Sequence, residues 1–322
     1  MKPLSIYIHI PFCERKCPYC DFVSDSHESS QNHERYVEEL CASLQTKVKQ
    51  SHGYIINTIY FGGGTPSFID AQYIVTILET IRTSFTVAPD AEITIECNPN
   101  SITREKLEAY KCAGINRISI GVQSFRNKTL RVLGRVHDVR QARNAIKLAG
   151  EYFDNVSIDL IHSVPSCKVK ISRRVLKSVK HVSAYALTSD KYEVVSDERS
   201  IKDQTKIEKI LHKYGIEKYE ISNFARIGYE CKHNLTYWEC GEWLGFGEGA
   251  KSHFNEPWSD NDKIMMGLRL VRGVPQVLLE SKMTEVRRLA ALGLLKIEKE
   301  RVMCTGRGFM IHNQVLGKLL DF

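Results

Sequence analysis

The sequence of 322 residues is 43% hydrophobic and carries a net charge of +7. A chain of this length buries more than one small core needs, so we expect one large α/β domain with a modest C-terminal appendage. No apolar run of about 18 residues occurs, and the first residues lead into a strand pattern without a signal-peptide apolar region. The sequence therefore predicts a cytoplasmic protein with no transmembrane segment, and the mild charge does not indicate a nucleic-acid partner.

Strand-like and helix-like segments alternate through the first two thirds of the chain. The predicted strands are largely β-branched and apolar, as expected of strands covered on both faces, and span 5–10, 55–61, 92–96, 117–121, 156–161 and 181–187. Six strand–helix units in sequence predict parallel strands joined by right-handed crossovers. Since a complete barrel needs eight, we expect a partial (β/α)6 TIM-like barrel, with its ligand at the C-terminal ends of the strands.

The remainder of the chain has a different character. Glycine and polar residues dominate 219–253, which predicts an irregular lid segment over the barrel mouth. Beyond residue 262 a helix at 284–292, a hairpin at 294–304 and a helix at 307–320 suggest a small winged-helix-like α/β region. We therefore divide the chain into a core barrel, 1–218, and a lid with a C-terminal helical domain, 219–322. Winged helices often bind nucleic acid, but for a terminal appendage we favour packing against the barrel.

The densest positive charge lies after the fifth predicted strand. A solvated helix face is the favoured interpretation, and attraction for an acidic ligand or partner is the alternative. The cations are Lys168, Lys170, Arg173, Arg174, Lys177 and Lys180.

Three of the ten cysteines follow the first strand closely, at Cys13, Cys17 and Cys20. A reducing cytosol disfavours a disulfide framework, so closely spaced thiolates point to metal. Three thiolates on a 4Fe-4S cluster leave one iron open. That iron could chelate the amino and carboxylate groups of S-adenosyl-L-methionine (SAM), and one-electron transfer would then release a 5′-deoxyadenosyl radical.

The alternative is structural zinc, with His9 as the fourth ligand. Three features weigh against it: the absence of a second cysteine pair, the aromatic Tyr19 before the last cysteine, and the glycine run after the second strand. The other cysteines are scattered, which indicates structural roles, and Cys231, close to His233, is unassigned.

Polar groups follow five successive predicted strands. The run Gly62-Gly63-Gly64-Thr65-Pro66 would allow close backbone approach to a ligand. The later strand ends offer Glu96, then Gln123 with Arg135 and His137 shortly after it, and then Asp159. Each alone could be structural, but together they predict a binding site at the top face of the barrel.

Four motifs resemble the oxygen-independent coproporphyrinogen III oxidase superfamily: Tyr7-Ile-His9-Ile-Pro-Phe-Cys13, Gly62-Gly-Gly-Thr-Pro66, Ile118-Ser-Ile-Gly-Val-Gln-Ser-Phe125 and Leu133-Gly-Arg-Val-His137. Within it, the chain is most similar to the HemW branch of heme chaperones. Oxidases carry a further cysteine where this chain has Phe22, and a long N-terminal arm that we do not expect here. The segment His233-Asn-Leu-Thr-Tyr237-Trp238 resembles the HemW signature His-Asn-x-x-Tyr-Trp.

The resemblance implies cofactor contacts residue by residue. His233 would be an axial ligand of heme, whose face Tyr237 and Trp238 would cover. The alternative is that His233 and Trp238 only anchor the lid. The SAM pocket would be lined by Tyr7, Tyr19, Gly63, Gly64, Thr65, Glu96, Gln123, Arg135, Asp159 and Ala186.

The resemblance also implies a function. We expect a chaperone that binds heme and passes it to an acceptor protein, with an external electron donor for the cluster. The alternative is an enzyme that oxidatively decarboxylates coproporphyrinogen III, and radical SAM modification of RNA is the least favoured.

The chain departs from these relatives in its later loops. It has His162-Ser-Val-Pro-Ser166 where they read Tyr-Gly-Leu-Pro-Gly, and Gly249-Ala-Lys-Ser252 where they read Gly-Ala-His-Ser. The segment 253–262 is also shorter than in the relatives. These changes leave the cysteine motif intact.

Overall fold

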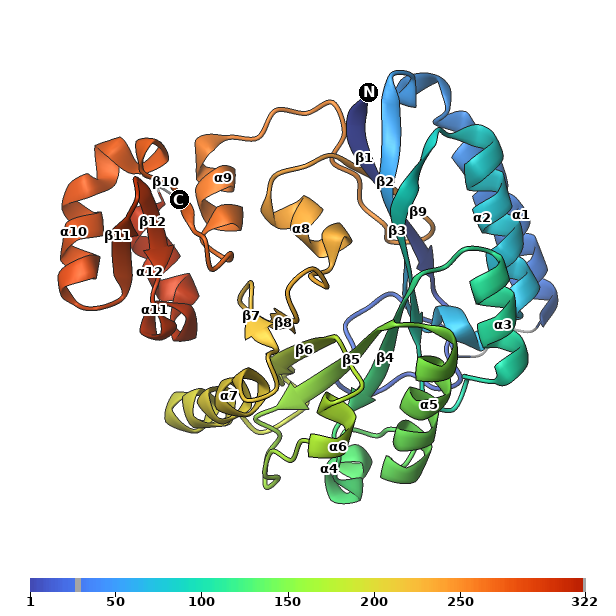
Figure 1. Cartoon of the computed structure of the whole chain (residues 1–322), viewed down its shortest axis with the longest axis horizontal. Coiled ribbons are helices and arrows are strands. Elements are labelled where there is room, and N and C mark those ends of the chain that lie inside the picture. Colours follow the sequence, from blue (N-terminus) through green and yellow to red (C-terminus); the bar gives the residue numbers. More distant parts are fainter. Residues whose placement is uncertain (27–29, 321–322) are drawn as a thin grey trace.

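The computed structural model describes residues 1–26 and 30–320. Its main body is a curved sheet with strand order β7-β8-β6-β5-β4-β3-β2-β1-β9 (Figure 1). The parallel centre of the sheet consists of β1 (Lys2–Ile10), β2 (Tyr54–Gly63), β3 (Val87–Cys97), β4 (Arg117–Gln123), β5 (Asn155–His162) and β6 (His181–Ala186). All six predicted strands are present, and the predicted partial barrel is confirmed.

Three short strands extend the sheet at its edges. Next to β6, β8 (Asn223–Ala225) and then β7 (Glu217–Lys218) add antiparallel strands. At the other edge, β9 (Trp243–Phe246) pairs parallel to β1. Since β8 and β9 lie in the predicted lid, that segment is part of the barrel wall, and the expectation of an irregular segment was wrong there. The division at residue 218 stays a prediction.

Helices cover the outer face of the sheet (Figure 1). Asp70 caps the helix after β2, and its side chain accepts a hydrogen bond from the Gln72 N–H at 2.8 Å. Glycines at 114 and 215 follow helices with φ of +87° and +67°, a backbone conformation that suits glycine at a helix stop. The helices and 3-10 turns of the barrel are α1 (Ser30–Thr46), η1 (Lys49–Ser51), η2 (Pro66–Phe68), α2 (Ala71–Ser84), α3 (Arg104–Cys112), α4 (Asn127–Val132), α5 (Val139–Tyr152), α6 (Arg173–Leu176) and α7 (Asp197–His212).

Alternate side chains of β1 point to opposite faces of the sheet, one set toward the apolar core and the other toward the concave side. Ile6, Ile8 and Ile10 are fully buried in the apolar core under the helices. The alternate residues Tyr7 and His9 face the other side of the sheet, where their polar groups hydrogen-bond to each other. The concave side of the barrel is therefore polar.

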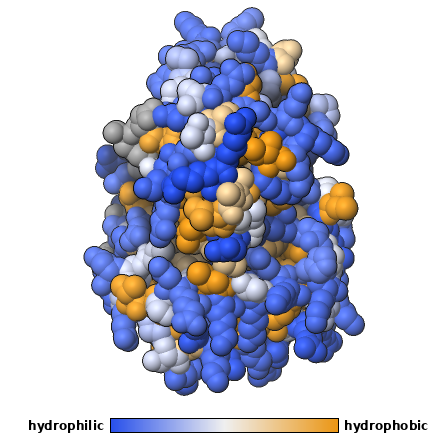
Figure 2. Space-filling view, turned by 90° about the vertical axis from the view of Figure 1, so that its left-hand side faces the viewer, coloured by the Kyte–Doolittle hydropathy of each residue, from blue (hydrophilic) through white to orange (hydrophobic). Residues whose placement is uncertain are grey.

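The C-terminal elements have a second apolar core, centred on Leu268, Leu279, Leu289 and Val302. The predicted helix 307–320 is interrupted at Ile311 (φ −124°, ψ 37°), so two helices stand in its place. Figure 2 shows the face that these elements form, which is mostly hydrophilic with hydrophobic side chains among the charges. The elements are α8 (Lys232–Trp238), α9 (Asp260–Gly267), β10 (Val274–Pro275), η3 (Gln276–Lys282), α10 (Met283–Ala291), β11 (Leu295–Glu298), β12 (Arg301–Cys304), α11 (Gly306–Met310) and α12 (His312–Leu319), with sheet order β10-β12-β11. Across the described ranges, no helix has the length and apolar character needed to span a membrane.

The serines that stand where relatives have glycine adopt a glycine-like backbone. Ser163 and Ser166 both have φ of +56°. A left-handed conformation costs a residue with a Cβ about 1 kcal/mol. We expect Ser166→Gly to raise the free energy of unfolding by about 1 kcal/mol, because glycine adopts this backbone without the steric cost. Among the described residues, the exposed Ser166 side chain has no hydrogen-bond partner that the change would remove. Urea denaturation measures the gain in stability.

The matched control is Ser281→Gly, at an exposed position with helical backbone in η3. There the same change should lower stability by about 0.5–1 kcal/mol. Equal changes in the free energy of unfolding at both positions would contradict the backbone strain at Ser166.

Candidate cluster and cofactor site

A cavity of about 590 Å³ opens at the C-terminal ends of the barrel strands. Twelve of the residues predicted for the cluster and SAM line it: Cys13, Cys17, Tyr19, Cys20, Gly63, Gly64, Thr65, Glu96, Gln123, Arg135, Asp159 and Ala186. Asn98, Tyr60 and Tyr185 also line it and were not predicted. Asn98 was recognisable, because it follows the strand that ends near Glu96. Tyr7, predicted for SAM, and His233, Tyr237 and Trp238, predicted for heme, lie outside its lining.

The cysteines occupy a loop pinched at its base. The Cys13 N–H donates to the Asp25 carbonyl and the Asp25 N–H to the Pro11 carbonyl, both at 2.8 Å. Cys13 Sγ lies 3.5 Å from Thr65 Oγ1, and the Arg135 guanidinium donates to Cys17 Sγ at 3.4 Å. The loop thus turns its thiols toward the glycine run and Arg135. Burial raises the pKa values of the Cys13 and Cys20 thiols, so without metal these thiols stay protonated and a bound iron would replace their protons.

His9 forms hydrogen bonds to groups other than the cysteines. Its Nε2 lies 2.8 Å from the Val23 carbonyl and must donate to it, so Nδ1 accepts from the Tyr7 hydroxyl at 3.2 Å. Within residues 1–26 and 30–320, no three His, Cys, Asp or Glu side chains converge as one metal ion requires. The zinc alternative is therefore unsupported, whereas a cubane spreads its thiolates over separate irons.

The glycine run is required by close packing against the base of the cysteine loop. A Cβ on Gly63, which has φ of +111°, would lie 2.6 Å from the His9 ring, and one on Gly64 would lie 2.7 Å from the Pro11 carbonyl oxygen. The Gly64 N–H donates to the Ile10 carbonyl at 2.8 Å. Any side chain here would push the glycine loop away from the cysteines.

Two carboxylates form one side of the cavity. The Tyr60 hydroxyl donates to Glu96 Oε1 at 2.7 Å, and the Ser119 hydroxyl to Asp159 Oδ1 at 3.1 Å. Burial, with the neighbouring Asp159, raises the pKa of Glu96 to about 7, and burial also raises the pKa of Asp159. Such a pair favours a cationic ligand group such as an ammonium.

Arg135 also lines the cavity and is tied to several elements. It donates to the Gly121 carbonyl at 3.0 Å and the Tyr19 hydroxyl at 3.4 Å, and it hydrogen-bonds to Asn98. His137 stays inside the barrel wall, where burial lowers its pKa to about 4 and it bonds the Val122 carbonyl. The cavity is thus lined by a cation and two carboxylates, which suits an amino acid moiety.

His233 lies inside the barrel, 1% exposed. Thr58 Oγ1 lies 2.6 Å from its Nδ1 and the Tyr237 hydroxyl 2.8 Å from its Nε2, so both nitrogens have partners. Burial lowers its pKa to about 3. Glu92 holds the start of α8 by accepting from the His233 and Lys232 N–H groups at 3.1 Å. This geometry supports the anchoring alternative.

The other two predicted heme contacts also pack within the protein. The Tyr237 ring meets Trp243 edge-on at 4.7 Å, and the Arg269 guanidinium lies 4.2 Å from the centre of the Trp238 ring. α8 therefore links the barrel interior to the C-terminal elements.

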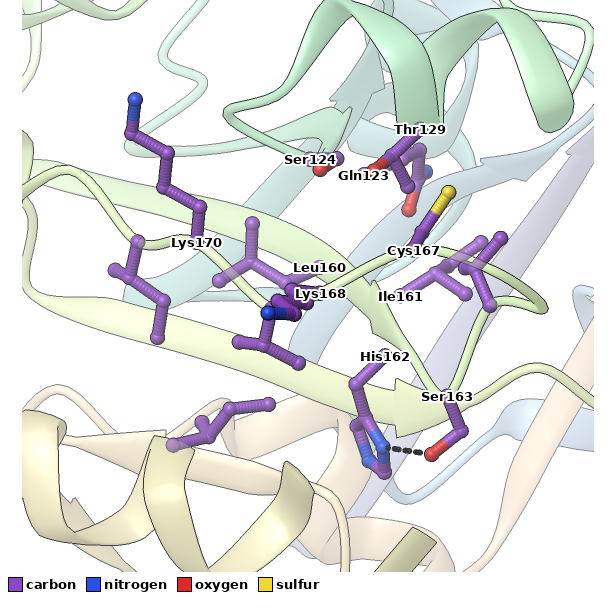
Figure 3. Close-up of a pocket in the computed structure, with 14 residues that line it drawn as sticks. Gln123, Ser124, Thr129, Leu160, Ile161, His162, Ser163, Cys167, Lys168 and Lys170 are labelled. Atoms are coloured by element: carbon purple, nitrogen blue, oxygen red, sulfur yellow. Dashed lines mark hydrogen bonds between the residues drawn. The ribbon is translucent and has the colours of Figure 1, made fainter. Parts of the chain in front are cut away.

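A second, narrow cavity of about 20 Å³ lies beside Gln123 and is formed by the loop that departs from the relatives (Figure 3). His162 Nδ1 lies 2.8 Å from Ser163 Oγ, which donates to Ser200 Oγ at 3.1 Å. Burial lowers the pKa of His162 to about 4. The cavity holds at most about one water, so these residues act as packing.

Comparisons with known proteins agree with this arrangement. The model of the Radical SAM superfamily matches residues 7–166. The heme chaperone HemW of Escherichia coli (strain K12) is 37% identical over 271 residues, which cover 80% of this chain and 72% of that protein. The heme chaperone HemW of Mycobacterium tuberculosis (strain H37Rv) is 30% identical over 374 residues, covering 99% of this chain and 95% of that protein. The chain belongs to the HemW heme chaperone family.

Membership of the HemW family and the Radical SAM superfamily implies a 4Fe-4S cluster and SAM as cofactors. Coproporphyrinogen III oxidase (HemN) from Escherichia coli, a radical SAM enzyme, has a solved structure that matches with a TM-score of 0.81 at 19% identity. The match covers 99% of this chain and 90% of that one, and it shows a common fold.

Proposed function

We propose that this chain binds heme and passes it to an acceptor protein, using a cluster held by Cys13, Cys17 and Cys20 and SAM bound in the mouth cavity. The observation that carries the proposal is the lining of that cavity. Three thiols, an arginine and two carboxylates surround one space in a chain of the HemW family. All ten cysteines are free, which suits the reducing cytoplasm.

The charges of the cavity residues indicate which part of SAM each would bind. Glu96 and Asp159 would hold the cationic groups of SAM, and Arg135 its carboxylate. Tyr19 and Ala186 would bound the adenosine side, and the glycine run would bring backbone groups to the ligand. When bound, the cluster and SAM supply one-electron cleavage of a carbon–sulfur bond.

The proposal for heme rests on family membership and on the segment from His233 to Trp238. Iron could reach His233 Nε2 only if the Tyr237 hydroxyl released it. Ligation by His233 therefore stays a prediction, with covering of the porphyrin by Tyr237 and Trp238, and its test is argued in the Discussion. Decarboxylation of coproporphyrinogen III is the alternative.

The first experiment is anaerobic reconstitution with iron and sulfide, followed by heme titration. We expect four irons per chain in the wild type and in Cys112→Ala, a control at an exposed cysteine, but not in the triple variant Cys13→Ala/Cys17→Ala/Cys20→Ala. Heme should bind one-to-one with a shifted Soret band. Absence of heme binding, with release of carbon dioxide from coproporphyrinogen III, would replace the chaperone proposal by the enzyme alternative.

A further inference from the structure

One side of the barrel mouth is positively charged and its charges are unpaired. Lys128 and Arg131 on α4, and Lys168 and Lys170 after β5, are exposed. Throughout the described ranges of the chain, none of these four has an ion-pair partner. The sequence contains no acidic residue between Ser124 and His137 or from Leu160 to Ser189. A solvated face would normally mix both signs, so this surface favours an acidic partner.

The two charged segments form one surface. The Lys128 ammonium donates to the Ser166 carbonyl at 3.3 Å, which joins α4 to the loop after β5. Lys168 and Lys170 follow on that loop, and Figure 3 shows the Lys170 side chain directed away from the narrow cavity. Lys128 therefore lies beside the loop that carries Lys168 and Lys170, and all three are exposed.

This surface adjoins the cysteine loop. The residue after the C-cap of α4, Gly134, packs so closely on Pro18 that an added Cβ would lie 2.7 Å from its Cδ. Arg15 also donates to the Gly134 carbonyl. Pro18 stands between Cys17 and Cys20, and a six-residue helix spans only about 9 Å. A protein seated on α4 would thus lie beside the cluster site.

The centre of this surface is apolar. Val132 and Val136 flank the Gly134 turn and are 37% and 38% exposed, and Pro18 beside them is also exposed. An apolar centre with a charged rim is the usual anatomy of a protein interface. Tyr192 borders this centre, and its hydroxyl donates to the Val132 carbonyl at 3.1 Å.

We propose that this α4 surface, defined by Pro18, Lys128, Arg131, Val136, Lys168 and Lys170, docks an acidic one-electron carrier protein that reduces the cluster. The inference rests on the proposed function, since it requires the cluster. One electron passes from the reduced flavin or iron–sulfur centre of the carrier to the cluster, so the carrier is oxidised and the cluster reduced, and no bond or proton changes. Complementary charge speeds such encounters even where the interface is small.

The test compares two double charge reversals. Lys128→Glu/Lys170→Glu changes the α4 surface. Arg287→Glu/Lys318→Glu is the control, because it makes the same change in net charge at two exposed cations of the C-terminal elements. A reduced plant-type ferredoxin serves as the probe. Its affinity for the cluster-free variants is measured by calorimetry, and the rate of cluster reduction by anaerobic stopped-flow absorption. Dithionite, a small reductant, reports whether each variant carries a reducible cluster.

At 50 mM NaCl we expect the α4 variant to bind ferredoxin about tenfold more weakly than wild type. We also expect ferredoxin to reduce its cluster about tenfold more slowly. The difference should fade at 500 mM NaCl, and the C-terminal variant should stay within about twofold of wild type. Equal ferredoxin rates in wild type and α4 variant, with normal dithionite reduction, would overturn the docking surface alone. Failure of dithionite to reduce the wild type would overturn the proposed function and this inference with it. Binding of a uridine oligonucleotide in place of ferredoxin would assign the surface to nucleic acid.

Discussion

SAM should bind the cluster-loaded protein about tenfold more tightly at pH 8 than at pH 6, and Glu96→Gln should abolish this pH dependence. Burial first, and then the nearby Asp159, raise the pKa of Glu96 to about 7. Its carboxyl is therefore mostly neutral at pH 6 and mostly ionised at pH 8, a change of about tenfold in the anionic fraction. SAM carries a cationic sulfonium, which prefers the anion, so affinity rises with pH.

Anaerobic calorimetry at pH 6, 7 and 8 measures this, with Glu108→Gln, an exposed carboxyl on α3, as the control. The control should keep the wild-type profile. If Glu96→Gln retained the tenfold change, another group would titrate and Glu96 would not contact the cationic part of SAM.

The raised pKa of Glu96 also predicts how the stability of the cofactor-free protein depends on pH. A carboxyl whose folded pKa is raised binds its proton more tightly in the folded state, so its ionisation opposes folding. The free energy of unfolding should fall as pH rises from about 4.5 to about 7, and the Glu96→Gln variant should not show that decrease. The Tm of the variant relative to wild type should therefore increase from pH 5 to pH 8, whether or not SAM binds.

The parts of the fold that sequence could predict depend on local pattern. Buried parallel strands read as apolar runs, and the site residues follow those runs at the strand ends, as Glu96 and Asp159 do. The spacing of the cysteines indicated their loop without any tertiary information. These signals are contained in a few neighbouring residues, so the barrel and the mouth cavity could be foreseen.

Other parts depend on contacts between distant segments. β9 is four residues long with a glycine inside, and it is a strand because it pairs with the edge of β1 and, through Trp243, with His253. α8 is seven residues long and is held by Glu92, far away in sequence. The direction of the His233 ring likewise depends on Thr58, so the sequence could not separate a heme ligand from an anchor.

Replacing His233 by alanine should therefore lower the free energy of unfolding by about 2–4 kcal/mol. The variant leaves a cavity beside Tyr60, whose ring stacks on the imidazole at 5.0 Å, and removes the bonding partner of Tyr237. Urea denaturation of the cofactor-free protein measures the loss. The control His52→Ala, at an exposed position, should change stability by less than about 0.5 kcal/mol.

Heme titration then separates the two interpretations of His233, and Tyr237→Phe provides a milder variant. If His233 only anchors α8, wild type and Tyr237→Phe should give the same Soret maximum and the same heme affinity. If Nε2 ligates iron, Tyr237→Phe removes its competing hydroxyl, so heme should bind more tightly than to wild type. Both nitrogens already have partners inside the barrel, so ligation of heme by His233 requires α8 to open. Tighter binding by Tyr237→Phe, with a Soret shift lost in His233→Ala, would mean that α8 opens to let His233 bind heme.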